Sequence, residues 1–157
     1  MRFRSVLDWK SPVSELLDPF QFFTELKKDI AAAGNQSRYA AKIGVAHTTV
    51  SAVLHSERNP SPEFLSGAGF DRLVRYRLLR GGIHAPLING MDFFTEVKKQ
   101  IREAGSLTTF CVRHKLPIGS VSNYLNDSRR ASDALVMATG YARLTRYRRR
   151  AVRSAAA

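Results

Sequence analysis

The chain contains one sequence pattern twice. The segment FFTELKKDIAAAG at residues 22–34 returns as FFTEVKKQIREAG at residues 93–105, and the register continues without a gap to residues 77 and 148. Of the 56 aligned pairs in residues 22–77 and 93–148, 20 are identical. Two copies of so long a repeat are too few for a stacked solenoid, which needs at least three. The pattern therefore predicts a duplicated small domain.

The length of 157 residues agrees with two domains of roughly 60 residues each. Domains this small are marginally stable alone, so they need dense helix packing or support from each other or from a second chain. The expected organisation is an N-terminal arm at 1–17, a first domain at 18–80, a linker at 81–88, a second domain at 89–153 and a tail at 154–157.

Each copy is expected to form about five short helices, so the predicted fold class is all-α, with two tandem helical domains. In the first copy Asp18 and Pro19 are typical of a helix start, and Gly34 ends the helix. The residues at helical spacing between them are Phe20, Phe23, Leu26, Lys27 and Ile30. In the second copy Asp92 is expected to start the helix and Gly105 to end it. Later helices are expected at about 35–42, at 47–54, from Ser61 onward and at 70–80, with counterparts in the second copy up to residue 150. No long alternating run predicts a strand.

The chain is strongly basic, with a net charge of +12 and a pI of about 10.6. This indicates a polyanionic partner, with nucleic acid first and an anionic membrane second. The charge is uneven, because residues 18–80 carry 9 basic and 6 acidic residues whereas residues 89–153 carry 13 and 5. No acidic residue follows Tyr141, which favours phosphate binding by the arginines near the C-terminus over a merely solubilising tail.

Several classes of function are not indicated by the sequence. No catalytic set, phosphate-binding glycine loop or metal-ligand spacing is visible, so we expect a non-enzyme with no cofactor, no metal and no evident small-molecule ligand. Cys111 is the only cysteine and lies in an apolar helical run, which indicates a core residue in a reducing cytoplasm. No segment has the length and apolar character of a membrane helix.

The segment QSRYAAKIGVAHTTVSAVL at residues 36–54 has the features of two helices joined by a tight turn. A small residue, Ala40, allows close helix approach, and Gly44 permits the turn. Apolar residues at Ile43, Val45, Val50 and Val53 fill the wedge between the helices. This segment resembles the helix-turn-helix of the lambda-repressor-like (XRE) family.

The second copy departs from this pattern at two positions. Lys115 replaces the turn glycine and His114 replaces the isoleucine, while the core positions stay apolar or aromatic at Phe110, Cys111, Leu116, Val121 and Tyr124. The ungapped register identifies it as a diverged copy.

The resemblance implies that the start of the third helix in each copy meets base edges in the major groove. Thr48 can hydrogen-bond a base, and Asn123 can pair with adenine through two hydrogen bonds. Other side chains near the helix ends would contact phosphate. The expected base contacts are His47, Thr48, Ser51, Ala52, Ile118, Gly119, Ser122 and Asn123. The expected phosphate contacts are Gln36, Arg38, Lys42, Arg58, Asn59, Arg113, Lys115, Arg129, Arg130, Arg146, Arg148 and Arg149.

These features together predict a sequence-specific double-stranded-DNA-binding regulator, a repressor of a phage or bacterium that acts in the cytoplasm. Counted with its flanking residues, the linker is about 11 residues long, and at roughly 3.3 Å each these would allow one chain to cover two adjacent major grooves about 34 Å apart. Because the reading positions differ, the two half-sites should differ; homodimerisation stays open. Two alternatives also stay open: a low-specificity architectural binder, and a regulator whose second repeat holds a protein partner.

Overall fold

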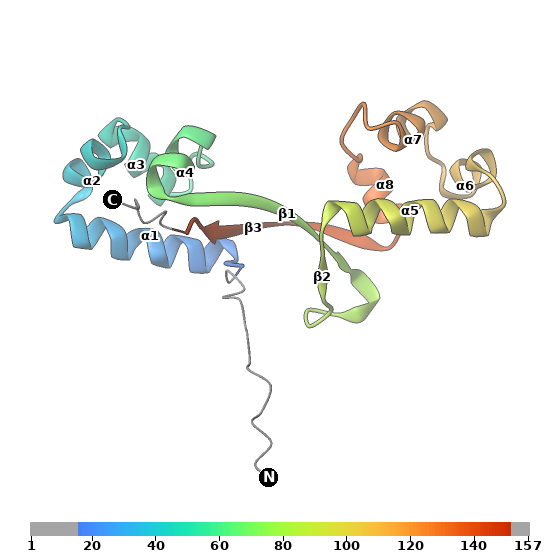
Figure 1. Ribbon diagram of the computed structural model, residues 1–157, viewed down its shortest axis with the longest axis horizontal. Helices are drawn as coiled ribbons and strands as arrows, with labels where there is room; N and C mark the ends of the chain where they lie inside the picture. Colours follow the sequence, from blue (N-terminus) through green and yellow to red (C-terminus); the bar gives the residue numbers. More distant parts are fainter. Residues whose placement is uncertain (1–15, 152–157) are drawn as a thin grey trace, which may run out of the picture. The chain divides into compact units, whose positions relative to one another are not determined.

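The chain has a mixed α/β fold. The computed structural model describes residues 16–151, which contain eight α-helices, one short 3-10 helix and three strands (Figure 1). The first repeat contains α1 (Pro19–Ala33), α2 (Gln36–Ile43), α3 (His47–Leu54), α4 (Pro62–Ala68) and β1 (Phe70–Leu78). The 3-10 helix η1 (Leu79–Gly81) and β2 (Leu87–Ile88) follow. The second repeat contains α5 (Gly90–Ala104), α6 (Leu107–His114), α7 (Ile118–Leu125), α8 (Asp133–Ala138) and β3 (Tyr141–Arg149).

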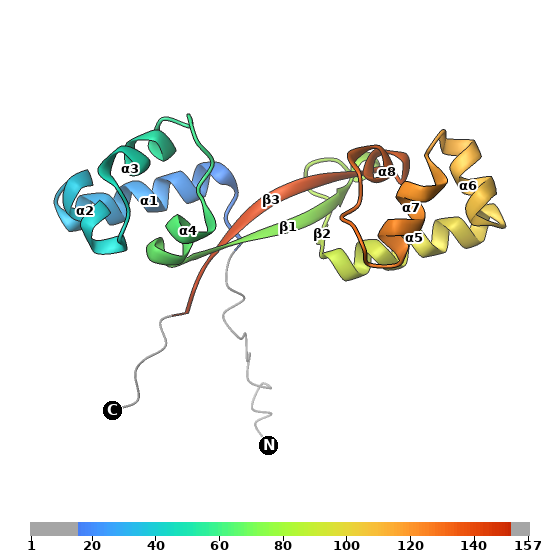
Figure 2. The ribbon, with the colours of Figure 1, turned by 90° about the horizontal axis from the view of Figure 1, so that it is seen from above.

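The prediction of an all-α fold was wrong, because the last segment of each repeat is a strand. The strands form one antiparallel sheet in the order β2-β1-β3, and β1 and β3 run side by side in both views (Figures 1 and 2). Phe70 and Tyr76 are both buried, and their even spacing puts them on one face of β1. The five residues between them, which include two arginines and one leucine, fit a helix as well as a strand, so the sequence pattern alone did not distinguish the two. This segment forms a strand because it pairs with β3, which lies far away in the sequence.

The elements of the two repeats correspond one to one. The first three helices and the strand of the second repeat begin and end 71 positions after those of the first, and only α8 ends a residue early. The structural repeat also includes residues that precede the predicted domain starts at 18 and 89. Leu17 forms a bridge with Tyr147, and Ile88, which lies 71 positions after Leu17, pairs with Tyr76. The end of the predicted arm and the end of the predicted linker are therefore equivalent edge segments, while the rest of the arm lies outside the described residues.

Local sequence determines most helix ends as expected. Asp18, Asn35, Ser61, Ser106 and Ser132 each accept a hydrogen bond from the backbone N–H three residues later, which caps the helix that follows. The first helix of the second repeat differs from the prediction. It is capped by Asn89 and begins at Gly90, two residues before the predicted start at Asp92.

The apolar face of the first helix also differs in part. Leu26 and Ile30 are buried as predicted, but Phe22 is the buried aromatic residue, and Phe20 is 81% exposed. Phe93, the counterpart of Phe22, is buried in the same way. The spacing of four between residues 22, 26 and 30 gives a straighter stripe along the helix than the predicted set.

The chain divides into two compact units whose boundaries cut through the strands. Unit 1 comprises residues 1–73 and 146–157, and unit 2 comprises residues 74–145. The predicted domains at 18–80 and 89–153 keep each repeat whole, whereas these units exchange the ends of β1 and β3. The core of unit 1 therefore includes Tyr147 from the second repeat, and the core of unit 2 includes Tyr76 from the first repeat.

The exchanged tyrosines occupy equivalent positions. Tyr147 stacks on Phe22 with 4.1 Å between ring centroids, and Tyr76 stacks on Phe93 at 4.0 Å. Both tyrosines are 6% exposed. Each repeat thus supplies the aromatic side chain that completes the core around the first helix of the other repeat.

Cys111 is buried in the core of unit 2, as predicted, and burial raises the pKa of its thiol. Within residues 16–151, no helix has both the length and the apolar character needed to cross a membrane.

Candidate nucleic-acid interface

The predicted helix-turn-helix of the first repeat consists of α2, a tight turn and α3. The Asn35 side chain accepts a hydrogen bond from the Arg38 backbone N–H at 2.9 Å and so starts α2. Gly44 ends it with φ 75° and ψ 31°, a left-handed conformation that glycine adopts without steric cost. The Val45 backbone N–H then donates to the Ala40 carbonyl at 3.0 Å. These bonds determine where α3 begins.

The second repeat builds the same turn without the glycine. Lys115 has φ 55° and ψ 43°, and the Leu116 backbone N–H donates to the Cys111 carbonyl at 2.9 Å. A non-glycine residue in this region costs roughly 1–2 kcal/mol. The bond from Leu116 corresponds, position for position, to the bond from Val45. The substitution at Lys115 therefore leaves the turn intact.

The helices α3 and α7 each have a buried face and an exposed face. Val50 and Val53 of α3 and Val121 of α7 are almost completely buried. The predicted base-contacting residues lie outside this buried set. His47, Thr48, Ile118, Gly119 and Asn123 are exposed, and Ser51, Ala52 and Ser122 are partly exposed.

Neither α3 nor α7 begins with a side-chain cap, since Ala46 and Pro117 precede them. Their first backbone N–H groups are therefore not hydrogen-bonded by a capping side chain. Such groups can donate to a phosphate oxygen. The start of each helix thus combines exposed side chains with available backbone donors.

Most of the predicted phosphate contacts are exposed side chains around these two helix pairs. Arg58 and Asn59 also line a cavity of about 510 Å³ together with Gly44, Ala46 and Thr49, so they lie beside the turn and the start of α3. Gln36 is only partly exposed. The exposed members of the predicted set around the two helix pairs are Arg38, Lys42, Arg58, Asn59, Arg113, Lys115, Arg129 and Arg130, and Arg149 at the end of β3 is exposed as well.

The arginines at the end of β3 have partners within unit 1. Arg149 pairs with Glu25 at 3.2 Å and with Asp29 at 3.0 Å, while Arg148 and Arg150 both pair with Asp71, at 3.5 and 2.7 Å. Arg146 is partly buried within β3. The excess positive charge in the C-terminal sequence is therefore partly neutralised by acidic residues of the first repeat.

These partners lower the pKa values of two of the carboxylates. Hydrogen bonds from Lys28 and Arg149 lower the pKa of Glu25, and hydrogen bonds from Arg150 and Arg148 lower the pKa of Asp71. Sequence reasoning missed these pairs because it assigned the arginines to the second repeat and the acids to the first. The spacing of Glu25 and Asp29, four residues apart on one helix face, was the available signal.

Arg143 has a structural position in unit 2. Its guanidinium donates to the Asp133 carboxylate and to the Ala131 carbonyl. This ties the middle of β3 to the start of α8. Within residues 16–151, no group of three or more metal-ligating side chains lies together.

Comparisons of the chain with protein-family models, with curated proteins and with solved structures find no match. The case for a function therefore depends on the geometry and chemistry of the chain itself.

Proposed function

We propose that the chain is a sequence-specific double-stranded-DNA-binding transcriptional regulator in which α3 and α7 each enter a major groove. The observation that carries this proposal is the repeated construction of the two helix pairs. In both, the same backbone bond closes the turn, at least one buried valine lies on the inner face of the second helix, and at least one exposed arginine lies in the loop that follows it. The family resemblance of the sequence adds to this argument.

The exposed faces suit the chemistry of a major groove. A helix of this width fits the groove, where each base pair shows a distinct pattern of donors and acceptors. Asn123 can form two hydrogen bonds with adenine, and Thr48 can bond a base or contact a thymine methyl group. Exposed arginines near these helices would bind phosphate and hold the register.

The two reading faces differ, so the chain should recognise two unlike half-sites. At the first positions α3 presents His47 and Thr48, whereas α7 presents Ile118 and Gly119. Imidazole and hydroxyl groups can hydrogen-bond bases, but the α7 start offers only apolar contact. We infer that unit 1 contributes more base selectivity and unit 2 more backbone affinity.

Selection of bound sites from random duplex DNA tests this proposal. We expect two short, dissimilar motifs at a fixed spacing, with specific binding at least ~10³-fold tighter than binding to bulk genomic DNA. Footprinting of the selected site should show two protected regions. A specificity ratio near one would contradict the proposal and favour a low-specificity architectural binder.

Replacing both Arg129 and Arg130 by alanine should weaken DNA binding about equally for all sequences. Each phosphate contact contributes about 0.9 to the slope of log K against log salt concentration, so the slope should become less steep by about 2. Binding isotherms at several salt concentrations measure this. The double variant Arg72→Ala with Arg75→Ala removes the same charge from β1 and should leave the slope nearly unchanged. An unaltered slope in the first variant would favour a protein-binding role for the second repeat.

A further inference from the structure

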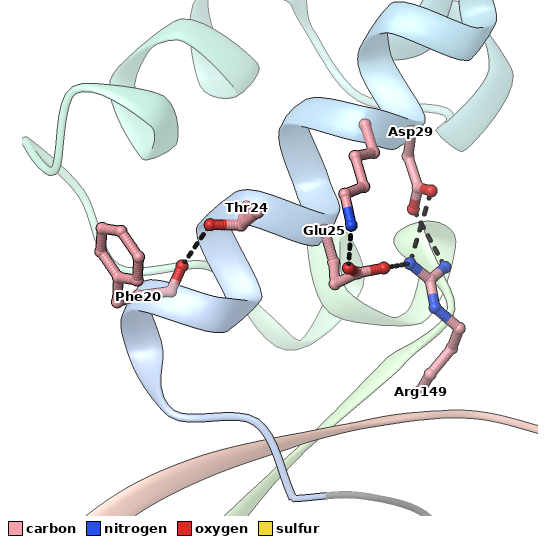
Figure 3. Close-up of polar contacts among 6 residues, drawn as sticks. Phe20, Thr24, Glu25, Asp29 and Arg149 are labelled. Atoms are coloured by element: carbon pink, nitrogen blue, oxygen red, sulfur yellow. Dashed lines mark hydrogen bonds and ion pairs between the residues drawn. The ribbon is translucent and has the colours of Figure 1, made fainter.

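Unit 1 contains a guanidinium site that the chain itself fills. The Arg149 guanidinium lies between two carboxylates of α1, with Nη1 3.0 Å from Asp29 Oδ2 and Nη2 3.2 Å from Glu25 Oε2 (Figure 3). Its central carbon lies 4.5 Å from the centroid of the Phe70 ring. Two carboxylates and an aromatic face are the usual surroundings of a bound guanidinium.

The equivalent place in unit 2 is a cavity. The position of Arg149 corresponds to Leu78, whose side chain is uncharged, and Phe70 corresponds to Tyr141. Glu25 corresponds to Glu96, and Asp29 to Gln100. All four residues of unit 2 line a cavity of about 750 Å³. The repeat thus places a cavity in unit 2 where unit 1 holds the side chain of Arg149.

The polar groups of this cavity can accept hydrogen bonds from a cation. Gln100 Nε2 donates to Glu96 Oε1 at 3.3 Å and to the Thr139 carbonyl at 3.1 Å, which orients the amide and leaves its own oxygen as an acceptor. None of the ion pairs found within residues 16–151 involves Glu96. Burial, together with the charge of Glu96, raises the pKa of Tyr141, so the phenol stays neutral.

The other side of the lining is basic. Arg80, Lys99 and Arg113 line the cavity, and Glu103 is the only further acid there. Arg113 and Lys99 lie in positions equivalent to Lys42 and Lys28 of unit 1, but unit 1 has alanine, Ala32, in place of Glu103. With Glu96 engaged by a cation, the remaining lining has a positive excess that suits a carboxylate.

We propose that this cavity of unit 2 binds a small molecule with a guanidinium at one end and a carboxylate at the other, of which free arginine is one example. The guanidinium meets Glu96, Gln100 and the ring of Tyr141, and the carboxylate meets the basic lining. This proposal does not depend on DNA binding.

Calorimetric titration of the whole chain tests it with three probes. L-arginine should bind at one site per chain, citrulline should bind at least tenfold more weakly because it lacks the cation, and N-acetyl-arginine amide should bind at least tenfold more weakly because it lacks the carboxylate. Equal binding of the amide would overturn the choice of a free zwitterion and point to an arginine of a protein partner. No binding of L-arginine at millimolar concentration would overturn the proposal altogether.

Two variants locate the site. Glu96→Gln should weaken L-arginine binding at least tenfold, while the matched change Glu25→Gln in unit 1 should leave it unchanged. Leu78→Arg should abolish binding, because it supplies the guanidinium that Arg149 supplies in unit 1. Circular dichroism checks that each variant is folded. Equal losses from Glu96→Gln and Glu25→Gln would contradict the assignment to unit 2.

Discussion

Replacing Tyr147 by alanine will loosen the helices of the first repeat, although the residue belongs to the second. Tyr147 is 6% exposed and stacks on Phe22 in the core of unit 1. Truncating a buried aromatic residue to alanine costs about 3–5 kcal/mol. Since small domains are stable by only about 5–15 kcal/mol, unit 1 should lose a large part of its stability.

Amide hydrogen exchange measures the effect where it occurs. In Tyr147→Ala the protection of α1 to α4 should fall by about a hundredfold or more, because each 1.4 kcal/mol is tenfold in an equilibrium constant. The helices α5 to α8 should change much less. The backbone pairing of Leu17 with Tyr147 does not depend on the side chain, so the strand contact can persist in the variant.

The matched variant Tyr76→Ala should have the reverse pattern. Tyr76 stacks on Phe93 in the core of unit 2, so protection should be lost in α5 to α8 and kept in α1 to α4. If each variant instead loosened the helices of its own repeat, the exchange of strands between the repeats would be refuted. The pair of variants is informative because both residues have the same burial and the same kind of stacking.

The exchange also explains which parts of the fold could be predicted from the sequence. The ends of α2, α3, α6 and α7 follow from local signals, namely caps, turns and apolar spacing, and they lie within a residue of their predicted bounds. The strands β1 and β3 depend on each other across about 70 residues. No local pattern contains that information, and the arginine-rich segment between Phe70 and Tyr76 suits a helix equally well.

The candidate site likewise has a part that local sequence predicts and a part that depends on the exchanged strands. Side chains placed by local helix geometry, such as Thr48 and Asn123, are exposed as the repeat pattern indicates. The spacing of Glu25 and Asp29 marked an acidic helix face, but it did not identify Arg149 as the partner, because Arg149 reaches these acids only through the exchanged strand. The cavity of unit 2 could not be predicted for the same reason. Leu78 stands at the position equivalent to Arg149, and it lines this cavity only because the strands are exchanged.

Replacing Thr48 by glutamate should weaken specific DNA binding about a hundredfold while the chain stays folded. Thr48 is exposed in the first turn of α3, where an acidic side chain interacts favourably with the helix dipole, so the change should not destabilise the helix. In a major groove the variant would lose the base contact of Thr48, which contributes about 1–3 kcal/mol. The new carboxylate would also be repelled by the DNA phosphates. Fluorescence anisotropy with the selected site measures the dissociation constant.

Phe20→Glu is the control for charge alone. Phe20 is 81% exposed in the first turn of α1, so the variant gains the same negative charge in the same kind of helix position. It should bind DNA within about threefold of the parent chain, because a single distant charge is largely screened at physiological salt. Equal losses in both variants would mean that net charge, and not the α3 face, governs binding. Gly119→Glu makes the matching change in α7, and a loss there as well would place both helices on the DNA.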